Sequence, residues 1–372
     1  MTSLRLMLPV LGLLIVLPTA SADEAALRER LSEHVEAMLD AWPLAPLHVS
    51  IGIAGTDLCF DESAELIRAL APALRWLPPD LADRTTALLD AEVTAHPPWT
   101  DVAYYPWDEG ARREWFAMPD APRIRDKAAP RAHPLARLHA TWLYAHECDR
   151  WDVVDGAWPQ IRQVYRDFVD SGWSLDPAKG DVHANAYLAG LIAFERIAGR
   201  HDEDVAADAA ERAEALAEVV VDHLRRGADK LSPEVLEGLA GIDALLAGEG
   251  PLFLQVESHR CVPAKLLDLT PEVAALLAER APGEAALLLG WVDQLMPGWY
   301  LTAEERQVHH GENLMDFPST ALAFYEAKAW VTREPPERLE AWIDMPWCAG
   351  DLTYIRKLVA CLGRVGTEDG DD

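Results

Sequence analysis

The apolar positions along this chain repeat mostly with the period of an α-helix. In the segment 133–151, HPLARLHATWLYAHECDRW, Leu135, Leu138 and Trp142 fall on one face, and this spacing predicts an amphipathic helix. The segment 185–200, NAYLAGLIAFERIAGR, is apolar almost all round, so we expect its helix to be buried on most sides. Similar patterns predict helices over 23–39, 152–173, 202–228, 232–246, 271–294, 318–332, 336–343 and 351–362.

Strand patterns are few. The segments 47–55, LHVSIGIAG, and 251–257, PLFLQVE, are the two short candidates, because they alternate or are rich in β-branched residues. Long loops rich in Pro and Trp separate the helices, above all 96–133. The predicted fold class is therefore all-α, with at most a few short strands.

The first 22 residues have the pattern of a secretory signal peptide. Arg5 is followed by an apolar run over 6–17 and by the small residues Ala20, Ser21 and Ala22, which form a cleavage site of the A-x-A type. The run is shorter than the roughly 20 residues that cross a bilayer. An uncleaved anchor is the alternative. We expect a mature chain over 23–372, secreted or periplasmic, without a membrane span.

The net charge of the chain disfavours some classes of binding partner. The chain carries 62 acidic against 33 basic residues, a formal net charge of −29. On average such a surface repels nucleic acid and anionic membranes, so we predict no nucleic-acid partner. The five cysteines, at 59, 148, 261, 348 and 361, contain no CxxC pair, and we expect most of them to be buried free thiols.

An internal repeat is also present. The segment 70–100 and the segment 269–300 share a Pro near the start, a Leu-Leu pair and a closing P-x-W. Pro72 matches Pro271 and Trp99 matches Trp299. In the alternative to a true repeat, two unrelated helices are bounded by similar Pro and Trp residues. A repeat so widely spaced, with helices between its copies, suggests a ring or double layer of helical hairpins.

Three segments carry a resemblance to a known group: LYAHECDRWDVVDGAWPQIRQVYRDF, GDVHANAYLAGLIAFERIA and AKAWVTREPPERLEAWIDMPWCAGDLTYIRKLVACL. Together they cover most of 140–362, and they resemble bacterial exported proteins with an (α/α) six-hairpin toroid. The resemblance implies one glycosidase-like toroid domain over 23–364. That fold serves glycan hydrolases, polysaccharide lyases and some non-catalytic proteins, so it does not settle function. We expect the acidic tail 365–372 to be disordered.

The first candidate cluster lies just before the apolar helix at 185–200. It contains Asp181, His183, Asn185 and Tyr187. His183 and Tyr187 would share a helical face and act with Asp181 in proton transfer, while Asn185 would bind a substrate oxygen. In the alternative, Asp181 caps the helix and the others belong to the core.

The second cluster is HHGENLMD, residues 309–316. His310 and Glu312 would point the same way on an extended loop and form a carboxylate–imidazole site, with Asn313 binding substrate. A metal site needs three or four convergent ligands, and no further ligands are visible, so we predict no metal and no cofactor. A structural loop with Asp316 capping the next helix is the other alternative.

The third cluster is an aromatic and basic loop. Between Arg112 and Arg137 lie six Arg and one Lys against three acids. The faces of aromatic side chains can stack on sugar rings, and the paired N–H donors of an arginine guanidinium can bind a carboxylate or sulfate group. In the alternative, the aromatics fill the core and the arginines pair with surface acids. The predicted substrate-binding residues here and at the end of the second repeat copy are Tyr104, Tyr105, Trp107, Arg113 and Trp299.

These clusters support two chemistries for an acidic poly- or oligosaccharide. Hydrolysis needs two carboxyl groups, and elimination needs a neutralised carboxylate with a His or Tyr base. The carboxyl candidates are Asp108, Asp181, Glu312 and Asp316, and the elimination candidates are Tyr104, Arg113, His183, Asn185 and His310. We predict an exported carbohydrate-active protein, a glycoside hydrolase or polysaccharide lyase if it is an enzyme. The alternative is a non-catalytic glycan-binding or scaffold protein. Its oligomeric state is left open.

Overall fold

The computed structural model describes residues 23–41, 49–50, 57–58, 63–100, 133–174, 183–229, 269–295, 318–343 and 352–368. Within these ranges the protein is all-α, as predicted, apart from a two-stranded antiparallel pair. Strand β1 (Val49–Ser50) lies inside the predicted strand at 47–55 and pairs with β2 (Asp57–Leu58).

Most of the described helices follow the predicted ranges, whereas the helices at 63–70 and 79–95 lie where no helix range was predicted. Their bounds are α1 Glu24–Ala41, α2 Ser63–Leu70, η1 Leu74–Trp76, α3 Pro79–Ala95, η2 Pro134–Arg137, α6 Leu138–Glu147, α7 Trp151–Gly156, α8 Trp158–Asp170, α9 Ala184–Ala198, α10 Glu203–Asp229, α14 Pro271–Arg280, α15 Pro282–Leu295, α17 Pro318–Trp330, α18 Pro336–Ala341 and α19 Leu352–Glu368. The predicted helix at 232–246 and the predicted strand at 251–257 lie outside the described residues.

Three helix boundaries differ from the sequence prediction. The helix expected over 152–173 is two helices, α7 and α8, which are separated at Ala157. The helix expected over 271–294 is two helices, α14 and α15, separated at Ala281. Pro282 explains the break, because it lacks an N–H and disfavours helical backbone in the residue before it. Helix α19 continues to Glu368, so it extends into the segment 365–372 that the sequence predicted as a disordered tail.

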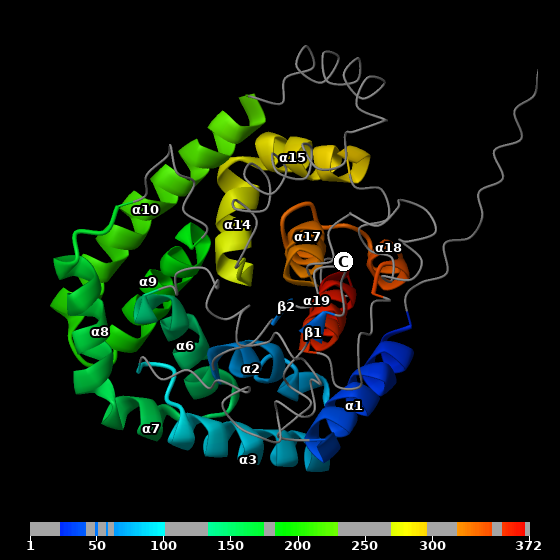
Figure 1. The fold of residues 1–372 in the computed structure, drawn as a ribbon, viewed down its shortest axis with the longest axis horizontal. Coiled ribbons are helices and arrows are strands. Elements are labelled where there is room, and N and C mark those ends of the chain that lie inside the picture. The colour runs from blue at the N-terminus through cyan, green and yellow to red at the C-terminus, as the bar shows by residue number, and fades with distance from the viewer. Residues whose placement is uncertain are drawn as a thin grey trace, which may run out of the picture.

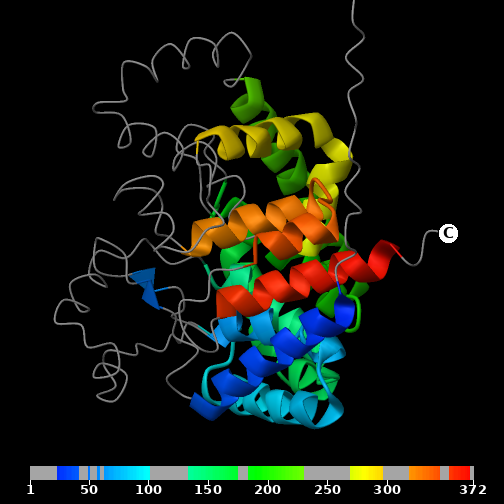
Figure 2. The ribbon, with the colours of Figure 1, turned by 90° about the vertical axis from the view of Figure 1, so that its right-hand side faces the viewer.

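The helices form an inner and an outer set (Figure 1). The inner helices contact one another in the order α2, α6, α9, α14, α17 and α19, and α19 contacts α2 again. Most of the outer helices, α1, α3, α10, α15 and α18, pack against neighbours in this inner set. Figure 2 shows α15, α17, α19 and α1 side by side with similar directions. Residues far apart in the sequence therefore meet around the centre.

Helix α9 is buried on most sides, as its apolar pattern predicted. Twelve of its fifteen residues are buried, because α6 and η2 cover it from one side and α10 from another. Gly190 is needed for the packing against η2. A Cβ at this position would lie 2.2 Å from the backbone oxygen of Leu135, so only glycine fits without a shift of backbone.

The two copies of the sequence repeat fold differently at their start. The segment 70–100 forms the end of α2, a turn, η1 and α3, whereas the segment 269–300 begins directly with α14 at Pro271. The residue that matches Pro271, Pro72, lies in the turn after α2. The matched Leu-Leu pairs lie in helices in both copies, in α3 and in α15.

Two further expectations concern cysteine and the membrane. Cys148 and Cys361 are buried free thiols, and burial raises the pKa of each to about 12, so these two thiols are unreactive. Cys59, Cys261 and Cys348 lie outside the described residues. In the described part of the chain, no helix combines the length and the hydrophobicity that a membrane crossing requires.

Candidate functional site

A cavity of about 950 Å³ lies among the inner helices. Helices α2, α6, α14, α17 and α19 line it, together with the turns after α2 and α17. Pro72 and Pro271, the matching prolines of the sequence repeat, both reach it. The described lining residues with polar or aromatic side chains are Arg68, Arg75, His139, Trp142, Glu147, Thr270, Glu272, Glu326, Trp330, Arg333, Arg356 and Arg364.

The cavity is positively charged in a strongly acidic chain. Its described lining has five arginines and three glutamates, a difference of +2, against −29 for the whole sequence. Charge of one sign inside a concave, low-dielectric site concentrates counter-ions there. The lining therefore favours an anionic ligand over a cationic one.

Glu272 is the centre of one charged cluster in this lining. Thr270 caps α14 by accepting a hydrogen bond from the Val273 N–H, and Glu272 follows in the first turn, where the helix dipole favours an acid. Its Oε1 accepts a hydrogen bond from Arg196 at 2.7 Å. Its Oε2 lies 3.2 Å from Nε2 of His139 on α6. One carboxylate thus joins α14, α9 and α6.

The electrostatics of this cluster determine the charge states of Glu272 and His139. Burial alone raises the pKa of Glu272, but hydrogen bonds from His139 and Arg196 outweigh it, so its pKa lies well below the usual range. Burial lowers the pKa of His139, and Glu272 only partly opposes this. At neutral pH Glu272 is therefore ionised and His139 neutral, with its Nε2–H directed at the carboxylate. Nδ1 of His139 has no hydrogen-bond partner in the described structure.

Acidification is expected to destabilise the fold through His139 first. The lowered pKa means that protonation favours the unfolded chain, so stability is greatest above the ordinary histidine pKa of 6.5 and falls below it. Urea midpoints of the wild type should therefore decline between pH 6.5 and 4.5, and the His139→Gln variant should decline less. The depressed pKa of Glu272 adds a second loss below its ordinary value of 4.5.

Equal slopes for the wild type and His139→Gln would contradict a neutral, buried His139.

Trp142 forms a wall of the cavity beside this cluster. The guanidinium of Arg196 lies over its ring at 4.2 Å from the centroid. The ring of His146 stacks on it at 5.0 Å with an interplanar angle of 12°. These two neighbours hold Trp142 in place through cation–π and stacking contacts. Trp142 is therefore a fixed part of the lining.

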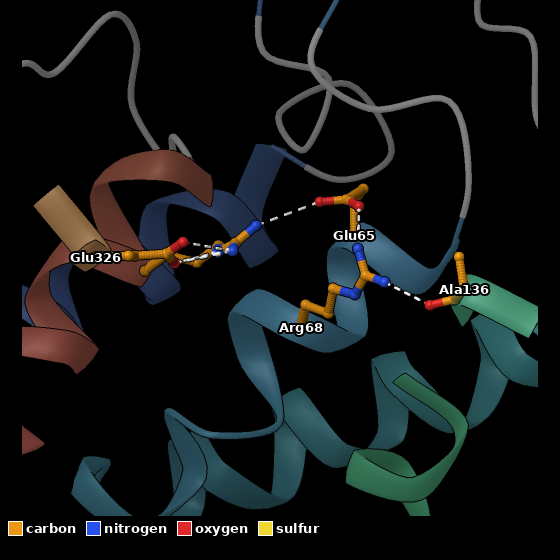
Figure 3. Close-up of polar contacts among 5 residues, drawn as sticks. Glu65, Arg68, Ala136 and Glu326 are labelled. Atoms are coloured by element: carbon orange, nitrogen blue, oxygen red, sulfur yellow. Dashed lines mark hydrogen bonds and ion pairs between the residues drawn. The ribbon is translucent and has the colours of Figure 1, made fainter. Parts of the chain in front are cut away.

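A second charged cluster joins α2, α17 and α19 (Figure 3). Arg356 donates from Nε to Glu326 Oε1 and from a terminal nitrogen to Oε2, both at 2.9 Å. Its other terminal nitrogen lies 3.4 Å from Glu65. Arg68 donates to Glu65 at 2.9 Å and to the backbone oxygen of Ala136 at 2.7 Å. Because Glu326 is only 2% exposed, this pairing neutralises a buried carboxylate.

Glu147 and Arg333 differ from these paired groups. Both line the cavity, and neither makes a hydrogen bond or ion pair with another residue in the described ranges. Arg75 has a single hydrogen bond, from Nε to the Pro72 oxygen at 3.3 Å. These three side chains are the ones that the described lining leaves most able to contact a ligand.

Three of the predicted site residues are described, and none lines this cavity. His183, Asn185 and Tyr187 lie at the start of α9, whereas Arg196, which belongs to the cavity cluster, lies near its end. Tyr187 is 5% exposed, and its hydroxyl accepts a hydrogen bond from the His133 N–H at 3.1 Å. Its ring is 4.6 Å from that of Trp173.

The remaining predicted residues lie outside the described structure. They are Tyr104, Tyr105, Trp107, Asp108, Arg113, Asp181, Trp299, His310, Glu312, Asn313 and Asp316. Two residues that flank the aromatic and basic loop are described. Trp99 is buried and donates to Gln160 at 3.0 Å. Arg137 is buried and bonded to the backbone oxygen of Thr100. Both therefore have structural roles.

Sequence reasoning did not identify the cavity residues. One signal was present: Glu326 and Lys328 interrupt the otherwise apolar and small helix ALAFYEAKAW. A charge on an apolar helix is a candidate for a buried, paired group. Among the described residues, no group of three or more His, Cys, Asp or Glu side chains is placed to hold a metal ion.

Comparison with known proteins assigns no family. No protein-family model matches the chain, and no curated protein and no solved structure matches it.

Proposed function

We propose that this protein is carbohydrate-active and takes an acidic poly- or oligosaccharide into the cavity among its inner helices. The observation that carries the proposal is the composition of that lining. Arginines and a carboxyl group that have no ion-pair partner among the described residues face the same space as two indole rings. We further propose that the inner and outer helices form an (α/α) six-hairpin toroid. The cyclic order of contacts among the inner helices supports this.

The size and walls of the cavity suit a short glycan. About 950 Å³ lies at the upper end of the range for small-molecule sites. Trp330 is partly buried and lines the cavity, and an indole ring is a suitable surface for a sugar ring. Arg75 and Arg333 supply donors for a uronate or sulfate group.

Glu147 is the carboxyl group best placed for proton transfer. Glu272 is held ionised by Arg196 and His139, so it can stabilise positive charge, but it has no proton to donate at neutral pH and is a weak base. Glu326 is bound on both oxygens by Arg356. We propose that Glu147 exchanges a proton with the bound sugar, as the acid of a hydrolysis or as the base of an elimination.

A second function is favoured by one observation. Two of the three cavity glutamates, Glu272 and Glu326, are neutralised by arginine. Such pairing stabilises a binding site without providing a pair of catalytic carboxyl groups. The protein would then be a non-catalytic glycan-binding protein that uses the same cavity.

The Glu147→Gln variant is expected to lower turnover of a polyuronate at least about a hundredfold, the usual size of general acid–base catalysis. Its affinity for the glycan should change little, because the amide keeps the shape of the carboxyl group. A panel of polyuronates is incubated with the protein, and products are followed by ultraviolet absorbance and by a reducing-end assay. Unsaturated ends indicate elimination, and reducing ends without unsaturation indicate hydrolysis.

The matched control is Glu211→Gln on the exposed surface of α10, which should keep wild-type turnover. Wild-type binding without turnover would support the non-catalytic function instead. Absence of both binding and turnover across the panel would contradict the proposed substrate class.

A further inference from the structure

We propose that Arg333 recognises the acidic group of the ligand and so determines selection of acidic over neutral glycans. This inference deepens the proposed function and rests on it. It depends on three observations about Arg333: its backbone conformation, its position in the cavity lining and the lack of a described partner for its guanidinium.

The backbone of Arg333 is in the left-handed region. Its φ is +51°, at the point where the chain turns away from the end of α17. The turn is held by bonds from the Thr332 N–H to the Ala327 oxygen at 3.3 Å and from the Glu334 N–H to the Lys328 oxygen at 3.0 Å. Glycine is the residue usually found in this conformation after a helix, because it has no Cβ to clash.

A comparison within the chain shows that Arg333 is unusual. The other described non-glycine residue with positive φ is Asp149, at +52°, after the end of α6. Aspartate is one of the residues that adopt this conformation more readily, because a short polar side chain can bond to nearby backbone. Arginine has no such local compensation, so its presence costs stability. Strained residues that persist beside a cavity are candidates for a functional role.

The side chain of Arg333 lines the cavity, and its charge has no partner among the residues that the structure describes. The residue is exposed and lines the cavity. Arg68 and Arg356, by contrast, are each bonded to glutamate. The guanidinium of Arg333 has no hydrogen bond or ion pair to another described residue. Its planar fork of donors matches the two oxygens of a carboxylate or sulfate.

Recognition of an acidic group explains why arginine occupies a position that favours glycine. A neutral sugar offers hydroxyl groups, which can bond equally well to many polar side chains. A uronate offers a carboxylate, for which a bidentate arginine is the matching partner. Arg333 therefore contributes to discrimination between sugars.

The Arg333→Gly variant separates the effect of this residue on stability from its effect on ligand binding. The variant is expected to melt about 2 °C higher than the wild type, because glycine relieves the left-handed conformation. Its affinity for a galacturonate trimer should fall about tenfold, the size of a partly exposed charge-assisted hydrogen bond. Its affinity for the uncharged galactose trimer should not change. Calorimetry measures both affinities and the melting temperature.

Asp149→Gly is the matched control, since it places the same residue at the other left-handed position and Asp149 does not line the cavity. It should bind the acidic trimer as the wild type does. If Arg333→Gly also binds the acidic trimer as tightly as the wild type, or melts lower than it, the inference is wrong.

A sulfate titration distinguishes failure of this inference from failure of the proposed function. If the wild type binds neither trimer, the glycan proposal fails for these probes. Sulfate at an ionic strength matched with chloride still tests Arg333, because it carries the same anionic oxygens. A larger rise in melting temperature for the wild type than for Arg333→Gly supports the role in anion recognition. Equal rises overturn it.

Discussion

Replacing Gly190 by alanine is expected to lower the free energy of unfolding by about 2 kcal/mol. The new Cβ would lie 2.2 Å from the Leu135 oxygen and 2.9 Å from its carbonyl carbon. Both atoms belong to backbone, so α9 and η2 must separate. Overpacking of this kind costs about 1–3 kcal/mol or more, which exceeds the gain of up to ~1 kcal/mol from replacing a helical glycine. Denaturant midpoints measure the difference.

Gly290 on α15 is the matched control for this substitution. A Cβ there meets no atom within 4 Å, so Gly290→Ala should stabilise the protein by about 0.5–1 kcal/mol through helix propensity alone. The same chemical change is thus expected to have opposite signs at the two positions. Stabilisation by Gly190→Ala would show that α9 and η2 are not in close backbone contact.

Replacing Glu326 by alanine is expected to cost about 3 kcal/mol, the largest effect of a single substitution in this chain that we identify. The carboxylate is 2% exposed and binds Arg356 through two hydrogen bonds. Its removal takes away both short hydrogen bonds of Arg356 and leaves the longer contact to Glu65 in place. Breaking a buried pair leaves a charge without compensation and typically costs about 3–5 kcal/mol. Urea unfolding of the purified variant measures this loss.

A double variant distinguishes loss of the pair from loss of packing. Glu326→Leu combined with Arg356→Met removes both charges, and it should recover much of the stability, since apolar replacement of a buried pair is often neutral. Asp222→Ala, which breaks the exposed pair with Arg226 on α10, should cost less than ~0.5 kcal/mol. A double variant less stable than Glu326→Ala would mean that packing, and not charge, dominates at this site.

Most of the helices were predictable because the apolar residues of each follow a helical pattern in its own sequence. The pattern of α9 indicated burial on most sides, and 12 of its residues are buried. The break between α14 and α15 was missed although Pro282 was visible, because the apolar pattern continues across it. The pattern of apolar residues therefore predicted where the helices lie, whereas the missing N–H of Pro282 determined where α14 ends.

The cavity was not predictable in the same way, because its residues come from five inner helices. His139, Glu272 and Arg196 are separated by up to 133 positions, and in the sequence each resembles an ordinary polar residue of an amphipathic helix. Glu272 in particular fits the usual acid of a first helical turn. Only the order in which the helices contact one another brings these side chains together.

The sequence contains one sign of the unusual backbone at Arg333, and it can be recognised once the end of α17 is known. The segment WVTREPP has no glycine after the helix, where a left-handed residue commonly ends an α-helix. Which of the residues adopts that conformation depends on the bonds made by the Thr332 and Glu334 amides. The sequence alone does not determine those bonds.

The contacts of α19 with α1 and α2 have a consequence for the order of folding. Arg30 on α1 donates a hydrogen bond to Tyr354 on α19, across 324 positions of sequence. Such distant contacts form slowly, because the entropy of closing a long loop is lost before the contact compensates for it. During synthesis, α1 and α2 must wait with this face uncovered until α19 has emerged. Helix α19 thus completes the packing of a helix that lies more than 300 positions before it in the described chain.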